Sequence, residues 1–186
     1  MSELRIFRDD KPAAPEQVIT DASGIAKALE KEGILFERWK ADVELAPADG
    51  QDKVLAAYAK PIDKLKRAKG YVTADVVRMV PDAANRVEAR KKFLNEHQHS
   101  EDEVRFFVEG IGSFYLHLGP RVYQVLCERN DLISVPDNTK HWFDMGPAPR
   151  FTAIRLFTNP EGWVAKFTGA TIAEKFPPFG EQVRSV

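Results

Sequence analysis

A chain of 186 residues can bury one sizeable core and is short for two, so we expect a single domain, residues 1–186, that contains any active site. Its 27 lysine and arginine residues nearly balance its 28 aspartate and glutamate residues, which argues against a nucleic-acid or membrane-surface role based on bulk charge. The hydrophobic content of 44% is ordinary for a globular protein and argues against disorder.

The single cysteine, Cys127, cannot form an intramolecular disulfide. The first residues, MSELRIFRDDKPAAPEQ, carry charges where a signal peptide needs its apolar core, and no apolar run approaches the roughly 20 residues that a spanning helix requires. We therefore expect a cytoplasmic protein with no membrane and no nucleic-acid partner. The balanced charge is compatible with a monomer.

The first part of the chain, to about residue 92, is expected to be helical. DASGIAKALEKEGI (21–34) predicts an amphipathic helix with Asp21 or Ser23 as its N-cap and Gly33 as its stop. Its apolar residues share one helical face: Ile25, Ala28 and Leu29.

A second amphipathic stretch, QDKVLAAYAKPIDKLKRAKGY (51–71), predicts a helix that Pro61 should restart or kink. Its basic side chains indicate the solvated face of that helix rather than a binding patch: Lys64, Lys66, Arg67 and Lys69. TADVVRMV (73–80) and AANRVEARKKF (83–93) predict two further short helices.

From residue 103 the apolar pattern has a period near two, and turn residues separate short runs at a spacing of about 8 to 12, typical of an antiparallel sandwich or barrel. The runs are VRFFVEG (104–110), SFYLHLG (113–119), RVYQVLCE (121–128), LISVP (132–136), HWFDMG (141–146) and FTAIRLF (151–157). We therefore predict a mainly β fold, with a β-barrel over about 93–165 flanked by the N-terminal helices. The tail, about 166–186, should wrap the outside.

The stretch EHQHSEDE contains three candidate metal ligands within seven residues, His97, His99 and Glu103. Side chains two apart on a strand point to one face, so the two histidines can reach a common point. Four residues of straight strand span about 13 Å, too far for His99 and Glu103 to share an ion. The chain must therefore bend at residues 100–102, which are of turn-forming type.

A fourth ligand should come from another strand. His141 follows a strand, a proline and a turn, so it can begin a strand that faces the first hairpin, and His117 in FYLHL is the rival candidate. Three imidazoles and one carboxylate leave two octahedral positions free, which suits Fe(II), Ni(II), Mn(II) or Co(II) and admits Zn(II). The alternative is a polar hairpin that carries histidines by chance.

The spacing of these ligands, with Gly110 and with Pro136 five positions before His141, closely resembles the two motifs of the cupin superfamily. The departures stand at three glycine positions and at the final asparagine of the motifs: Lys91, Asn130, Asn138 and Met145. They concern turn geometry rather than the ligands, because asparagine also tolerates positive φ.

Within the cupins, EHQHSEDEVRFFVEG, DLISVPDNTKHWFDMG and FTAIRLFTNPEGWVAKFTG resemble acireductone dioxygenase of methionine salvage over nearly the whole chain. The resemblance implies a double-stranded β-helix (jelly-roll) barrel with flanking helices. It also implies one Fe(II) or Ni(II) ion per chain, held by residues that match four positions here: His97, His99, Glu103 and His141.

The substrates implied by the resemblance are an acireductone, 1,2-dihydroxy-3-keto-5-methylthiopentene, and O2. The implied products are formate and 4-methylthio-2-oxobutanoate with Fe(II), or formate, carbon monoxide and 3-methylthiopropanoate with Ni(II). Arg105 shares the parity of Glu103, so it can point into the barrel, and by resemblance it helps to generate the substrate dianion. A strand arginine paired with Glu109 or Asp102 is the alternative.

Further roles come from the resemblance, or from position in a strand. Arg155 is a second candidate for an inward cation, Glu96 matches a residue linked to metal loading, and Asp102 matches one linked to relaying conformational change. For both acids, a solvated surface position is the alternative. Three aromatics match residues around the family's pocket and could enclose the methylthio tail, or belong to the core: Phe93, Phe143 and Trp163.

Two other functions stay open. Another cupin metalloenzyme, such as an isomerase or a different dioxygenase, would use the same ligands on an unrelated substrate. A non-enzymatic cupin would bind a small molecule or a metal only, and its behaviour would not depend on Arg105.

Overall fold

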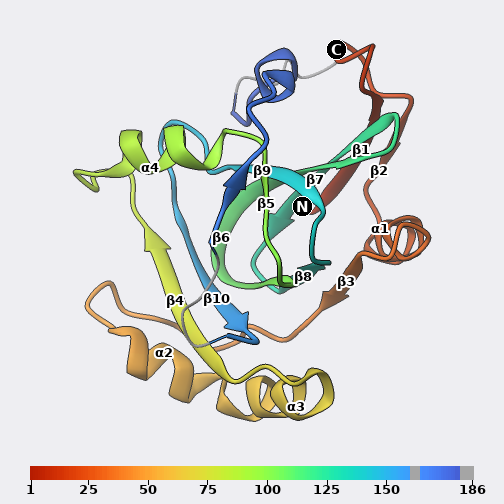
Figure 1. The fold of residues 1–186 in the computed structure, drawn as a ribbon. Helices are drawn as coiled ribbons and strands as arrows, with labels where there is room; N and C mark the ends of the chain where they lie inside the picture. Colours follow the sequence, from red (N-terminus) through yellow and green to blue (C-terminus); the bar gives the residue numbers. More distant parts are fainter. Residues whose placement is uncertain (160–163, 181–186) are drawn as a thin grey trace.

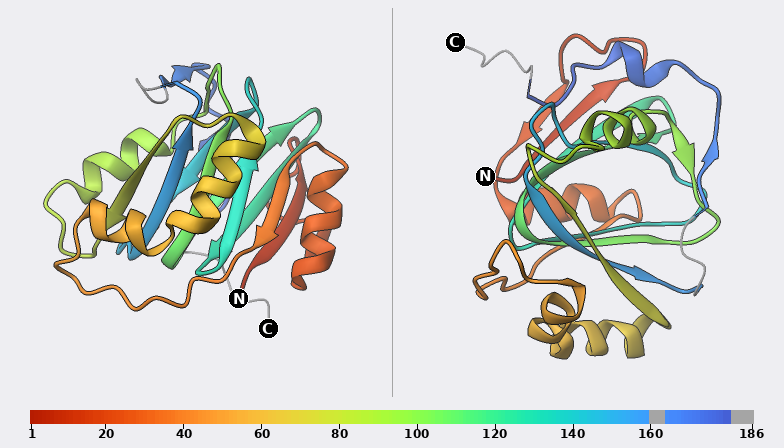
Figure 2. Two further views of the ribbon diagram at one scale, coloured as in Figure 1. Left: turned by 90° about the horizontal axis from the view of Figure 1, so that it is seen from below. Right: turned by 90° about the vertical axis from the view of Figure 1, so that its left-hand side faces the viewer.

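The computed structural model describes residues 1–159 and 164–180. Within these residues, eleven strands with antiparallel pairings form a sheet that curls into two layers facing one another across a common interior (Figures 1 and 2). The mainly β prediction is therefore confirmed.

The two layers share one strand. The first layer has the order β11 (Lys166–Phe167), β5 (His97–Gln98), β9 (Lys140–Asp144), β6 (Glu103–Leu118), β7 (Arg121–Glu128), β1 (Glu3–Arg8) and β2 (Gln17–Ile19). The second layer has the order β4 (Thr73–Met79), β10 (Phe151–Phe157), β6, β8 (Asp131–Val135) and β3 (Leu35–Arg38).

Strand β6 passes from one layer to the other at Gly110. Its first half pairs with β8 and β10, and residues 111–118 pair with β7. Gly110 has φ +69°, and a Cβ there would collide with the carbonyl oxygen of Arg150. Glycine avoids both the strain and the collision. The two strands predicted over 104–110 and 113–119 are therefore one continuous strand, and the glycine that indicated a turn marks its change of layer.

Most of the predicted helices are present. The structure has α1 (Ala22–Glu30), α2 (Gln51–Ala57), α3 (Ala59–Lys69), α4 (Arg86–Phe93) and the 3₁₀ helix η1 (Ile172–Lys175). Asp21 caps α1 by accepting the N–H of Gly24 at 2.7 Å. Helix α2 ends before Tyr58, and α3 begins after it with Pro61 in its first turn. Helices α2 and α3 pack their apolar faces on the outside of the second layer (Figure 2).

The prediction of a helix over 73–80 is wrong. This segment is strand β4, which pairs along its whole length with β10. Its side chains alternate, with Val76 facing the cluster under α2 and α3 and Val77 facing the barrel interior. This period of two, together with β-branched residues, favours a strand. Strands β1, β2 and β3 also lie in the segment expected to be helical, so residues 1–92 are mixed.

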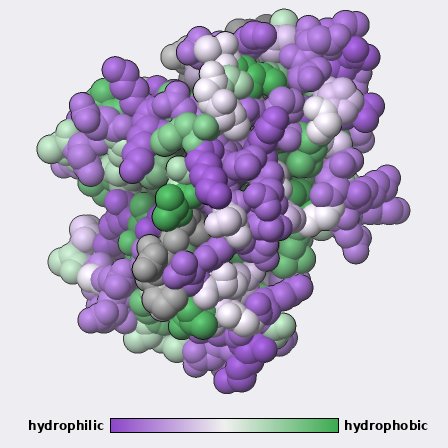
Figure 3. All heavy atoms as spheres, viewed as in Figure 1, coloured by the Kyte–Doolittle hydropathy of each residue, from purple (hydrophilic) through white to green (hydrophobic). Residues whose placement is uncertain are grey.

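Apolar clusters fill the interior and cover both outer faces of the barrel. The largest lies between the layers, and a smaller one joins the first layer to the C-terminal segment, where Phe176 packs on Phe7 and Trp142. The face drawn in Figure 3 is mostly hydrophilic, with hydrophobic residues in small separate groups. Among the helices that the structure describes, none is both long enough and apolar enough to span a membrane.

Asp144 ties helix α4 and the C-terminal segment to β9. Its fully buried carboxylate accepts two hydrogen bonds from Arg90, at 2.8 and 3.0 Å, and one each from the N–H groups of Gly146 and Phe179. Asp144→Ala leaves these donors without their acceptor, so we expect the free energy of unfolding to fall by about 3 kcal/mol or more. Urea denaturation measures this loss.

The matched control is Asp10→Ala, which removes an exposed ion pair with Arg8 and should leave the urea midpoint unchanged. Equal midpoints for Asp144→Ala and the wild type would contradict the anchoring role.

Candidate metal centre

Three imidazoles and one carboxylate converge inside the barrel. The ligand atoms of His97, His99, Glu103 and His141 all lie within 4.8 Å of one another, and all four side chains are buried. Strands β5 and β9 pair at His97 and His141, which brings the centres of these two rings to 4.5 Å. The structure thus brings together the four residues proposed from the sequence, and it places His117 outside this group.

The bends next to the four candidate ligands contain residues of turn-forming type. The chain bends at residues 100 and 101, between β5 and β6, as the spacing requires. The N–H of Asn138 donates to the carbonyl of His99 at 2.7 Å and so ties this bend to the turn before β9. Asn138 has φ 57° and Asn130 has φ 85°, so asparagine adopts the left-handed conformation at two positions where the cupin motifs have glycine.

The tautomer of each imidazole is set by the backbone. Each ring donates its Nδ1–H to a carbonyl oxygen: His97 to Asn95 at 2.7 Å, His141 to Thr139 at 2.7 Å and His99 to Val164 at 3.2 Å. A carbonyl oxygen only accepts, so the proton is on Nδ1 and the Nε2 lone pair is available. Neutral imidazole with a free lone pair is the form that binds metals.

The charges in the cluster favour a cation. Burial, with His141 beside it, lowers the pKa of His97 to about 4, so this ring is neutral at neutral pH. Burial would raise the pKa of Glu103, but the charge of Arg105 outweighs burial and holds this pKa well below its ordinary value. The cluster therefore contains a neutral imidazole at His97 and an ionised carboxylate at Glu103.

The spacing of the donor atoms fits one ion. The Nε2 atoms of His99 and His141 lie 3.1 and 3.0 Å from Oε2 of Glu103. Two ligands at right angles, each about 2.1 Å from an ion, are about 3.0 Å apart. Lone pairs that face a carboxylate oxygen at this distance repel one another unless positive charge lies between them. The donor set and its geometry therefore fit a divalent cation.

Arg105 lies directly behind the carboxylate. Its Nε is 2.8 Å from Oε1 of Glu103, the oxygen that faces away from the two histidines, and both side chains are buried. The guanidinium carbon lies 4.5 Å from the centre of the Phe143 ring and 5.1 Å from that of Phe114. Burial lowers the pKa of Arg105, yet a guanidinium stays protonated in proteins. A fixed cation therefore adjoins the cluster.

Two of the three expected pocket aromatics border Arg105. Phe93 ends helix α4, and its ring meets the Phe143 ring edge to face at 6.3 Å between centroids. The centre of the Phe93 ring is 5.9 Å from the guanidinium carbon of Arg105. Trp163 lies outside the described residues. That these aromatics enclose a substrate tail stays a prediction.

Arg155 faces the same side of the sheet as Arg105, because β10 and β6 pair at these two residues. Its guanidinium makes two hydrogen bonds to Asp75 on β4, at 2.8 and 2.5 Å. Asp75 lies in the segment expected to be a helix, so the sequence contained no signal for this pair. The two cations are thus neighbours, and each lies against an acidic side chain, Glu103 for Arg105 and Asp75 for Arg155.

The two acidic neighbours of the ligands have different surroundings. Asp102 is half-buried and accepts the N–H of Asp137 at 3.2 Å, which joins the start of β6 to the turn before β9. Glu96 is buried and points to the opposite face of β5 from His97, where it accepts a hydrogen bond from His117 at 2.7 Å. A solvated surface position is therefore wrong for Glu96.

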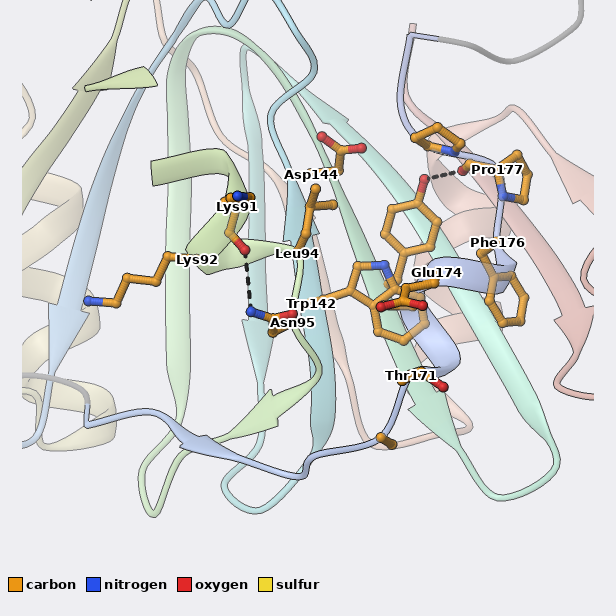
Figure 4. Close-up of a pocket in the computed structure, with 14 residues that line it drawn as sticks. Lys91, Lys92, Leu94, Asn95, Trp142, Asp144, Thr171, Glu174, Phe176 and Pro177 are labelled. Carbon is orange, nitrogen blue, oxygen red and sulfur yellow. Dashed lines mark hydrogen bonds between the residues drawn. The ribbon is translucent and has the colours of Figure 1, made fainter. Parts of the chain in front are cut away.

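A separate pocket of about 600 Å³ lies behind the cluster, on the outer face of the first layer (Figure 4). Its wall includes the stacked rings of Tyr115 and Trp142, whose centroids are 5.0 Å apart, together with Asn95 and residues of the C-terminal segment. None of the four candidate ligands lines this pocket. The side chains that converge on a cation point to the other face of the sheet.

Sequence reasoning missed the groups that orient the ligands. The carbonyls of Asn95, Thr139 and Val164 fix the three tautomers. Asn95 and Thr139 each stand two residues before the histidine they hold, a regularity visible in the sequence. Val164 is 65 residues from His99, and no local pattern links them.

Comparisons with known proteins agree with one another. The family model described as "ARD/ARD' family" matches residues 3–165. Acireductone dioxygenase of Pseudomonas aeruginosa is 55% identical over 177 residues, covering 95% of this chain and 98% of that protein. The enzyme of the same name from Alcanivorax borkumensis is 56% identical over 175 residues, covering 94% of this chain and 97% of that protein.

A solved structure has the same fold. Acireductone dioxygenase from Bacillus anthracis, with a cadmium ion in its active centre, superposes with a TM-score of 0.78 at 30% identity, covering 90% of this chain and 98% of that one. The resemblance read from the sequence is therefore confirmed. By family model, by sequence identity over nearly its whole length and by fold, the chain belongs to the acireductone dioxygenase (ARD/ARD') family of metal-dependent dioxygenases.

Proposed function

We propose that this protein cleaves 1,2-dihydroxy-3-keto-5-methylthiopentene with O2 in methionine salvage. The observation that carries the proposal is the buried convergence of three Nε2 atoms and one carboxylate beside a fixed guanidinium. We further propose formate and 4-methylthio-2-oxobutanoate as the products with Fe(II), and formate, carbon monoxide and 3-methylthiopropanoate with Ni(II).

We assign the ion to His97, His99, Glu103 and His141, one ion per chain. A bound divalent ion would supply Lewis-acid activation and a template for two substrate oxygens. The backbone carbonyls hold the imidazoles in their binding tautomer, so the donors need little rearrangement when an ion enters.

Arg105 is assigned to the ionisation of the substrate. A cation in a buried, low-dielectric position stabilises negative charge and lowers the pKa of a nearby hydroxyl. Arg155, held by Asp75, is a second cation on the same side of the sheet and is proposed to bind the substrate. The two guanidiniums together favour an anionic ligand between the cluster and β10.

The aromatic side chains are assigned to the apolar end of the substrate. Phe93 and Phe143 border Arg105, and ring edges contact a polarizable thioether favourably. Asp102 is proposed to transmit changes between the start of β6 and the turn before His141. Glu96 is proposed to support metal loading from the opposite face of β5.

The decisive experiment is metal analysis combined with product identification. The metal-free protein is reconstituted separately with Fe(II) and Ni(II), and products from acireductone and O2 are identified by mass spectrometry and gas analysis. We expect keto acid with Fe(II) and carbon monoxide with Ni(II). Stoichiometric metal without either product would exclude this substrate and favour another cupin activity.

The chain acts as one functional unit, because strands β1, β3 and β4 pair with strands of the barrel. A cytoplasmic location and a monomeric state stay predictions. Gel filtration with light scattering tests the latter.

A further inference from the structure

A second polar cluster lies on the back of β5 and is not used by the candidate metal centre. Glu96 is 2% exposed, and its two carboxylate oxygens have separate partners. Oε1 accepts from Nδ1 of His117 on β6 at 2.7 Å, and Oε2 accepts from the hydroxyl of Thr168, just after β11, at 2.7 Å. His117 also faces Asp9, with 3.8 Å between Nε2 and Oδ2. The carboxylate thus links three segments of chain.

Strand β5 needs such a link because it is only two residues long. It pairs with β9 at one position and with β11 at two. Short pairings of this kind hold a backbone weakly, yet this strand delivers His97 to the cluster. Hydrogen bonds from side chains of neighbouring segments can supply the additional restraint on β5 that these short pairings do not provide.

Glu96 is joined to the two peptide units that determine where the His97 ring points. The Asn95 carbonyl, which accepts the Nδ1–H of His97 at 2.7 Å, belongs to the peptide unit between Asn95 and Glu96. The Glu96 carbonyl, in the next peptide unit, accepts the N–H of Thr168 at 3.1 Å. Fixing the Glu96 side chain therefore fixes the carbonyl that sets the tautomer and direction of His97.

We propose that His117 and Thr168 are positioning residues for the metal centre, acting through Glu96. They touch neither the candidate ligands' donor atoms nor the barrel interior, since His117 shares the outer face of β6 with Tyr115. The inference rests on the proposed function only in requiring that His97 bind a metal. Groups that orient a ligand in this way typically change metal affinity about 10- to 100-fold when they are removed.

The test compares His117→Leu and Thr168→Val with the wild-type protein. Each is loaded with Ni(II), excess chelator is added and the rate of metal loss is followed. We expect both variants to lose the ion about tenfold faster. His117→Asn and Thr168→Ser retain a donor to Glu96 and should restore a rate close to that of the wild type.

A spectroscopic measurement separates positioning from stability. With Co(II) bound, the visible absorption reports ligand geometry, so the His117→Leu bands should shift and the His117→Asn bands should return toward the wild type. The control is Tyr115→Phe, which removes a hydrogen bond of 2.8 Å to the Pro177 carbonyl on the same outer face and should leave the hydrogen bonds of His117 and Thr168 to Glu96 in place. Its metal loss and spectrum should match the wild type.

The outcomes are distinct. Unchanged metal loss and spectra in both His117→Leu and Thr168→Val would overturn the inference and leave the proposed function intact. Equally fast loss from Tyr115→Phe would also overturn it, because the effect would then be general to the outer face. Absence of Ni(II) and Co(II) uptake by the wild-type protein would refute the metal centre itself.

Discussion

Replacing His141 with alanine is expected to remove bound metal and dioxygenase turnover together. Its Nε2 is 3.0 Å from Oε2 of Glu103, and its ring is the nearest neighbour across the sheet of His97. Without it, two imidazoles and one carboxylate remain, and the affinity for a divalent ion should fall by at least about a hundredfold. Metal content after dialysis and turnover with reconstituted protein measure the two losses.

The matched control for this variant is Lys140→Ala, one residue earlier on the same strand. Lys140 is exposed and pairs with His117 on the other face, so its loss should leave metal content and turnover unchanged. Metal binding should also raise the melting temperature of the wild type, because a ligand that binds only the folded state stabilises it. A His141→Ala protein with full metal and full turnover would exclude this residue from the centre.

Replacing Arg105 with methionine is expected to lower kcat/KM at neutral pH by roughly a hundredfold or more while metal content stays near one ion per chain. The effect is similar to removing one group that stabilises developing negative charge. The aliphatic side chain preserves packing against Phe143 and Phe114, and bound metal balances the charge left on Glu103.

The loss of turnover in Arg105→Met should depend on pH. A cation near the substrate lowers the pKa of the hydroxyl that must ionise, so removing the cation raises that pKa. Below the raised pKa the reactive anion is scarce, and turnover of Arg105→Met should therefore recover as the pH increases. Arg105→Lys keeps the charge, although it lacks the planar guanidinium, and the pH dependence of its turnover should shift less than that of Arg105→Met.

The control for charge removal is Arg38→Met. Arg38 forms an ion pair with Asp131 at 3.0 Å, at the opposite end of β8 from Val135, which pairs with Glu103. Its loss should leave the pH dependence of turnover unchanged even if the protein becomes less stable. Wild-type turnover by Arg105→Met at neutral pH would remove Arg105 from the reaction and favour a function that does not need it.

The sequence by itself determined the parts that depend on neighbours along the chain. A cap at Asp21 with apolar residues three and four apart indicates α1, and alternation indicates the barrel strands after residue 103. The H-x-H-x3-E spacing required a bend, which the structure has at residues 100 and 101. The motif spacing also selected His141 over His117.

The remaining features of the fold and the site were decided by tertiary structure, because contacts between residues far apart in the chain produce no pattern in the local sequence. β4 is a strand because β10 supplies its hydrogen-bond partners, although 73–80 was predicted as a helix. Arg105 had several possible acidic partners in its own segment, and packing against the Phe143 ring places it beside Glu103. The pairing of Glu96 with His117 likewise needed two strands to meet, since each strand alone shows only a polar residue on its outer face.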